Sequence, residues 1–283
     1  MMDIGFATPE EREEIALMMA TSFTKAKWDI TGWRKLLANR WGAPGDPFAV
    51  RVKDKGRVVG CLGLVTARRP TEVGDVVTCG MLSWYMLRDY RGTGAGKEML
   101  TLATQQPGVT VVNFASSVKA APVVVAAGLV ELETHRHLWL PSDGSTANAS
   151  NDPSALAELN VRDRRVLLDH EGLNLLPWAV KLSGEDPFLI LISPMKKNPG
   201  YINYELFYCG NRALMSKHAR AIANTILPKD AVLAIDSRFV EQDVTPDWTE
   251  PLSLPRYYTP GFMEPEYVDH IYSENILLGI KIH

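Results

Sequence analysis

The sequence has few cysteines, and they lie far apart. Only three occur, at Cys61, Cys79 and Cys209. An odd number of widely spaced cysteines fits neither a disulfide framework nor a cysteine-ligated metal site. We expect each of them to be a reduced thiol that behaves as a small hydrophobic residue. A small domain stapled by disulfides is therefore excluded.

Long apolar runs and clusters of basic residues are also lacking. The longest apolar stretch, residues 122–130, is far too short to span a bilayer. The beginning of the chain carries Glu10, Glu11, Glu13 and Glu14 without an apolar segment, which is not the pattern of a signal peptide. The net charge of -3 gives no electrostatic footprint for nucleic acid or an anionic membrane. We expect a cytoplasmic protein with neither of these partners.

The composition is that of a globular protein with a full core, because 46% of the residues are hydrophobic and 22% are charged. The 283 residues suffice for two domains of roughly 100–150 residues each. Residues 141–153 include no bulky apolar side chain and many small polar ones, which is typical of a surface linker. We therefore predict one domain at residues 1–140 and another at residues 154–283.

The first 140 residues alternate between segments typical of helices and of strands. Thr8, Pro9 and Glu11 form a helix start, and apolar residues follow at helical spacing. A turn at residues 54–56 separates two alternating segments, which is typical of a hairpin. We predict helices at residues 9–23, 29–41, 97–105 and 122–127, and strands at residues 48–52, 58–65, 76–87, 109–114 and 130–140.

A glycine-rich stretch, residues 91–97, joins the predicted strand 76–87 to the helix that follows. The backbone N–H groups of such a turn and the helix dipole both favour a bound anion. Two phosphate-binding motifs are excluded by spacing. The dinucleotide fingerprint needs G-x-G-x-x-G, whereas these glycines fall at every second position. The P-loop needs Ser or Thr after its lysine, whereas Glu98 follows Lys97.

The pattern that remains is R-x-x-G-x-G, formed by Arg91, Gly94 and Gly96. In its frame, residues 87–96, the stretch resembles the acyl-CoA pyrophosphate loop of the GNAT (GCN5-related) N-acetyltransferases. The order of the predicted elements resembles the layout of that family. This resemblance implies an α/β (α+β) fold with a mixed central sheet flanked by helices. It also implies acetyl-CoA or another acyl-CoA as cofactor, and no metal.

The same resemblance implies which residues hold the cofactor. Its phosphates would lie on the amides of the loop, to which Arg91 would add charge. Met86 takes the place of the strand-end residue whose backbone pairs with the pantetheine arm, and Ser117 that of the family's asparagine. The implied cofactor-binding residues are Met86, Arg91, Gly92, Thr93, Gly94, Ala95, Gly96, Lys97 and Ser117.

The residues for proton transfer depart from the family pattern. The family's proton donor is a tyrosine, and Val124 occupies the matching position. Because a valine cannot donate a proton, either another group acts or this half has lost catalysis. His135 and His137 share one face of the predicted strand 130–140 by alternation, and Tyr85 lies on the strand before the loop. These three are the candidate catalytic residues; a solvated sheet face and core packing are the competing interpretations.

The pattern partly repeats beyond the linker. Residues 208–211 stand where a second loop would lie but contain one glycine, so we expect no cofactor there. The chain thus resembles two GNAT-like halves in tandem, of which the second is degenerate. We predict helices at residues 155–170 and 211–226, and strands at residues 178–182, 188–193, 202–208 and 231–235.

These residues predict an acyl-CoA-dependent N-acyltransferase, with acetyl as the expected group and direct attack by the amine of a small molecule in a ternary complex. Residues 245–283 resemble C-terminal halves of acyltransferase-like proteins encoded with bacterial polysaccharide genes, which favours an amino sugar. Two alternatives stay open: a non-catalytic acyl-CoA-binding or structural protein, suggested by Val124, and a protein N-acetyltransferase. The sequence also leaves a homodimer open.

Overall fold

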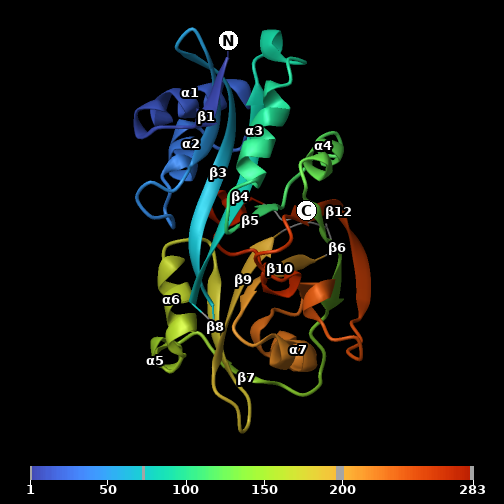
Figure 1. Cartoon of the computed structure of the whole chain (residues 1–283). Coiled ribbons are helices and arrows are strands. Elements are labelled where there is room, and N and C mark those ends of the chain that lie inside the picture. The colour runs from blue at the N-terminus through green and yellow to red at the C-terminus, as the bar shows by residue number, and fades with distance from the viewer. Residues whose placement is uncertain (1, 72–73, 196–200, 281–283) are drawn as a thin grey trace.

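The computed structural model describes residues 2–71, 74–195 and 201–280. Within them, twelve strands form one mixed sheet that runs through the molecule (Figure 1) in the order β1-β2-β3-β4-β5-β12-β6-β11-β10-β9-β8-β7. The predicted fold class is confirmed. The strands are β1 (Asp3–Phe6), β2 (Ala49–Asp54), β3 (Arg57–Thr71), β4 (Gly74–Met86), β5 (Val109–Asn113), β6 (Val130–Trp139), β7 (Asn148–Ser150), β8 (Leu176–Lys181), β9 (Phe188–Met195), β10 (Ile202–Cys209), β11 (Ala231–Asp236) and β12 (Trp248–Tyr258).

Helices cover both faces of this sheet. Adjacent residues of a strand point to opposite faces, and Met81 and Leu82 of β4 belong to two different apolar clusters. Helices α1 and α2 pack in the cluster of Leu82, and α3 packs in the cluster of Met81. The helices are α1 (Arg12–Ser22), α2 (Ile30–Leu37), α3 (Ala95–Thr104), α4 (Ala121–Ala126), α5 (Pro153–Ala157), α6 (Val161–Asp169), α7 (Arg212–Ile226) and α8 (Glu274–Leu278).

The two halves of the chain repeat one arrangement. In the first half, β4 and β5 are parallel and α3 connects them. In the second half, β10 and β11 are parallel and α7 connects them. In each half the turn before the connecting helix therefore lies at the carboxyl end of a parallel strand, which is where ligand-binding loops lie in open α/β sheets.

The halves also exchange strands, which the sequence did not indicate. Strand β12 comes from the second half but lies between β5 and β6 of the first, with Tyr257 opposite Asn113 and Trp248 opposite Leu138. Strand β6 in turn pairs with β11, where Trp139 lies opposite Leu233. Each half thus depends on the other for its backbone hydrogen bonds.

We expect that a fragment of residues 1–140 does not fold alone. Without β11 and β12, the outer edge of β5 and both edges of β6 would be unpaired, and exposed edges promote aggregation. Far-ultraviolet circular dichroism should show a cooperative thermal transition for the full chain and none for the fragment. Co-expression with residues 141–283 should restore soluble material. A lone fragment that melts like the full chain would contradict the exchanged sheet.

Two local features differ from the predicted elements. The predicted helix 155–170 is interrupted, because the Asn160 side chain accepts a hydrogen bond from the backbone N–H of Asp163 and begins α6 there. The segment predicted as a linker contains β7, which pairs with β8 at the edge of the sheet. The domain boundaries at residues 140 and 154 remain a prediction. Among the described residues, no helix is long and apolar enough to cross a membrane.

Candidate functional site

The glycine-rich loop lies between the end of β4 and the start of α3. Gly92 has φ +79° and Gly94 has φ +89°, a conformation that side chains with a Cβ rarely adopt. Gly94 is the N-cap of α3 and accepts from the N–H groups of Lys97 and Glu98. Among the described residues, the N–H groups of residues 92–96 donate to no acceptor. Five consecutive donors therefore remain available to an anion.

These donors open onto a cleft of about 390 Å³. The loop forms one wall, and Trp84, Met86 and Tyr90 with Val123 of α4 form the rest. The indole N–H of Trp84 is buried there without a hydrogen-bond partner among the described residues. A Cβ added to Gly96 would lie 2.9 Å from the Trp84 ring, so glycine is needed for α3 to approach this side chain. The cleft thus offers an unused side-chain donor beside the free amides.

Strands β4 and β5 separate beside this cleft. Their ladder runs from Val77 opposite Val109 to Gly80 opposite Val112 and ends there. We call the point at Gly80 and Val112 the fork. Beyond the fork, β4 continues to Met86 and pairs only with β3. A bulge with Ser83 at φ +52° interrupts that pairing. The β4 backbone that faces the gap therefore has no β5 partner.

The site fits a phosphate-bearing cofactor with a long arm. The free amides of residues 92–96 are donors for phosphates, and the gap beyond the fork gives an extended chain a backbone to pair with. Lys97, which is exposed on the first turn of α3, adds positive charge.

Several of the predicted cofactor residues have a different environment. Arg91 folds back, so that its Nε donates to the Met86 carbonyl at 2.9 Å and its guanidinium lies 5.3 Å from the centre of the Tyr85 ring. Ser117 lies outside the lining of the cleft, and its Oγ accepts from the Ala120 N–H at 3.3 Å at the start of α4. Val124 is buried in the apolar cluster on the α3 side.

The three predicted catalytic residues are not brought together. Tyr85 lies on the α1 and α2 side of β4, where its ring contacts Phe23. His135 and His137 lie on β6, far from the turn before α3 (Figure 1). His137 shares a hydrogen bond with Thr249 at 2.7 Å, and burial lowers its pKa. Among the described residues, no group of histidine, cysteine and acidic side chains could hold a metal ion.

The regular pairing of β6 with β12 at His135 and His137 ends before Glu133. Glu133 is buried, and its carboxylate accepts hydrogen bonds from the N–H groups of Thr134 and His135 and from the Ser237 hydroxyl. The register with β12 shifts at this position. Glu133 therefore stabilises the turn after β11 and does not share a solvated face with the histidines.

One carboxylate at the fork was not singled out from the sequence. Glu274, the first residue of α8, is 2% exposed, and neither of its carboxylate oxygens has a hydrogen-bond partner among the described residues. Its Oε2 lies 3.2 Å from where a Cβ on Gly80 would lie, beside Val65 and Val112. Burial raises the pKa of this carboxyl to about 7. Such a group is poised to gain or lose a proton near neutral pH.

Comparison with known proteins agrees with this geometry. Residues 13–109 match the model of the acetyltransferase (GNAT) family. A comparison with curated protein sequences gives no match. Among solved structures, a GCN5-related N-acetyltransferase from Anabaena variabilis is 12% identical and has a TM-score of 0.58, with 91% of this chain and 72% of that chain covered.

Two further structures are similar over most of both chains. A GCN5-related N-acetyltransferase from Kribbella flavida is 10% identical, with a TM-score of 0.53 and coverage of 91% of this chain and 70% of that chain. Eis1 from Mycobacterium abscessus is 11% identical, with a TM-score of 0.51 and coverage of 92% and 73%. At these identities the likeness shows the fold, and the family match covers β4, the loop and α3. Residues 13–109 thus match the GNAT family of acetyltransferases, and the chain shares the fold of the three solved structures named above.

Proposed function

We propose that this enzyme transfers the acetyl group of acetyl-CoA to the amine of a small molecule by direct attack, in the first half of the chain. One observation carries the proposal: the loop with free amides lies at the mouth of the gap between β4 and β5, and a buried carboxylate lies at the fork where that gap ends. The two groups stand at opposite ends of the β4 segment from Gly80 to Met86.

In this proposal the loop binds the phosphates of the cofactor, and acyl transfer takes place at the fork. The amides of residues 92–96, the Trp84 indole N–H and Lys97 hold the phosphates, and the β4 backbone beyond Gly80 aligns the arm. When bound, acetyl-CoA supplies an activated acyl group as a thioester. Arg91, which lines the cleft, would stabilise the loop through the Met86 carbonyl, to which its Nε donates.

Glu274 is the proposed general base. An acceptor amine is protonated in water and must lose a proton before its nitrogen can attack the carbonyl carbon. The Glu274 carboxylate would take that proton first. The neutral nitrogen would then form the C–N bond as the C–S bond breaks, the sulfur would leave with the electron pair of that bond, and the second proton of the nitrogen would pass to water. Tyr85, on the same face of β4 as Gly80 and Leu82, is the proposed donor of a proton to the sulfur.

The reaction can be tested by detecting free CoA thiol while acetyl-CoA is mixed with a panel of amines. Amino sugars are the first class to test, followed by amino acids, polyamines and peptides with free N-termini. We expect release with one class of small amine. Tight acetyl-CoA binding without release from any acceptor would instead support a non-catalytic role, the alternative that Val124 favours. Release with peptides alone would support a protein N-acetyltransferase.

A further inference from the structure

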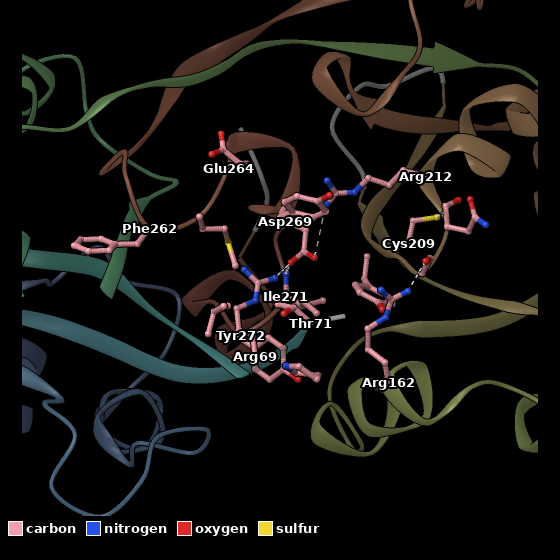
Figure 2. Close-up of a pocket in the computed structure, with 17 residues that line it drawn as sticks. Arg69, Thr71, Arg162, Cys209, Arg212, Phe262, Glu264, Asp269, Ile271 and Tyr272 are labelled. Carbon is pink, nitrogen blue, oxygen red and sulfur yellow. Dashed lines mark hydrogen bonds and ion pairs between the residues drawn. The ribbon is translucent and has the colours of Figure 1, made fainter. Parts of the chain in front are cut away.

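A second and larger cavity lies where the two halves meet. It has a volume of about 500 Å³, within the roughly 300–1,000 Å³ of small-molecule sites. Its walls come from five segments of the chain: the end of β3, the start of β4, α6, the turn between β10 and α7, and residues 262–272 after β12. Figure 2 shows Arg69 and Arg212 pointing toward Asp269, with Phe262 at the side of this group. None of them belongs to the cofactor cleft.

The lining is rich in arginine. Arg69 forms a buried ion pair with Asp269, and Arg162 donates to the Gly210 carbonyl at 2.5 Å. Arg212 approaches the same Asp269 from another side (Figure 2), but its nearest nitrogen is 4.0 Å from the carboxylate. With Glu264 as the other carboxylate of the lining, three guanidinium groups face two carboxylates. Because Arg69 pairs with Asp269 and Arg162 also pairs with Asp163, Arg212 has the longest ion pair of the three.

Arg212 has one nitrogen without a hydrogen-bond partner in the part of the chain that the structure describes, although another lies 4.0 Å from Asp269. Its Nη1 is buried and donates to no acceptor among the described residues, which is costly for a charged group. The guanidinium is held in place by the Phe239 ring, whose centre is 4.1 Å away. Burial lowers its pKa only to about 10, so it stays protonated at neutral pH. A planar, oriented cation with a free N–H matches a carboxylate or phosphate.

The turn beside Arg212 differs from the glycine-rich loop of the first half in its hydrogen bonds. A Cβ on Gly210 would overlap the Asp163 carboxylate at 2.1 Å, and the Gly210 N–H already donates to the Leu189 carbonyl. The Asp163 carboxylate itself accepts from the Leu189 N–H and the Tyr208 hydroxyl. The Gly210 amide is thus occupied, and Arg212 adds a side-chain donor beside this turn.

The cavity also offers aromatic surface for an apolar part of a ligand. Phe262 and Tyr267 line it and are 56% and 58% exposed. Exposed aromatic side chains beside a cationic anchor are typical of sites that bind an organic anion. We propose that this cavity binds a small organic anion, a carboxylate or a phosphate ester with an apolar or aromatic body, through Arg212.

The proposal can be tested by titration calorimetry with phenyl phosphate and inorganic phosphate. Saturating CoA should be present, so that the amides of residues 92–96 are occupied. We expect saturable binding of both, with phenyl phosphate the tighter, and at least tenfold weaker affinity in Arg212→Gln. The control Lys217→Gln, which removes the same charge from an exposed position of α7, should bind like the parent protein.

A second variant keeps the test decisive if Arg212→Gln does not fold. In the double variant Phe262→Ala and Tyr267→Ala, phenyl phosphate should bind several-fold more weakly, while inorganic phosphate should bind as before. The proposal is overturned if neither anion binds to the CoA-saturated protein. It is equally overturned if both variants bind like the parent protein, because the anion then lies elsewhere. Acetyl-CoA affinity, measured in parallel, reports separately on the cofactor cleft.

Discussion

Replacing Glu274 by glutamine is expected to lower kcat by about 100-fold or more, the range found when a general base is removed. Glutamine has nearly the same shape but cannot accept a proton from the acceptor amine. The KM for acetyl-CoA should change little, because the loop at residues 91–97 lies at the other end of β4. Steady-state CoA release with the best acceptor measures both constants.

The pH dependence separates a base from a merely structural glutamate. With a pKa of about 7, Glu274 is ionised only above neutral pH, so kcat/KM of the parent protein should rise with pH and level off above about 7. In Glu274→Gln this inflection should be absent. Glu266→Gln, an exposed carboxylate on the same segment, should keep the parent profile. A parent-like kcat in Glu274→Gln would exclude Glu274 as the base.

Although Glu274→Gln should lower kcat, it should raise the stability of the folded protein. The folded-state pKa of Glu274 is raised from 4.5 to about 7, so the folded state disfavours the charged form. The favourable contribution of the protonated Glu274 carboxyl to the free energy of unfolding is fully present below pH 4.5. It is lost as the pH rises toward 7, which lowers the free energy of unfolding by about 3 kcal/mol. Glu274→Gln should therefore raise the melting temperature at pH 8 more than at pH 4.5.

The loop could be predicted from the sequence because its signals are local. A strand, three spaced glycines and a helix follow one another within about thirty residues, and Gly92 and Gly94 do adopt positive φ values. The parallel pairing of β4 and β5 follows from the helix that connects them. For the same reason, the repeat of strand, helix and strand in the second half could be recognised.

The fork and the strand exchange could not be predicted in this way. Tyr257 pairs with Asn113 across more than one hundred residues, and no local pattern specifies which edge β12 will meet. The place of Glu274 depends on the same long-range packing, because α8 reaches β4 only after β12 has crossed the sheet. In the sequence it is one glutamate in an apolar C-terminal segment. The histidines of β6 were singled out by strict alternation, which holds from His135 to His137 but does not report how far they lie from the loop.

Gly94→Val is expected to weaken acetyl-CoA binding by at least tenfold, or about 1.4 kcal/mol. Gly94 has φ +89° and caps α3, and valine, which is branched at Cβ, cannot adopt this conformation without strain. The loop would change its path, and the amides of residues 92–96 would no longer converge on one anion. Titration calorimetry with acetyl-CoA measures the loss.

A matched control is needed to separate the effect of backbone strain at Gly94 from the loss of a binding group. Gly184, in the turn between β8 and β9, has φ +81° and, like Gly94, no atom within 4 Å of an added Cβ. Gly184→Val should therefore lower the melting temperature by a similar amount and leave acetyl-CoA affinity unchanged. If a folded Gly94→Val variant binds acetyl-CoA like the parent protein, the loop is a turn without a role in binding. The phosphates would then have to be held by side chains such as Lys97, because the free amides at the start of α3 would not be the recognition element.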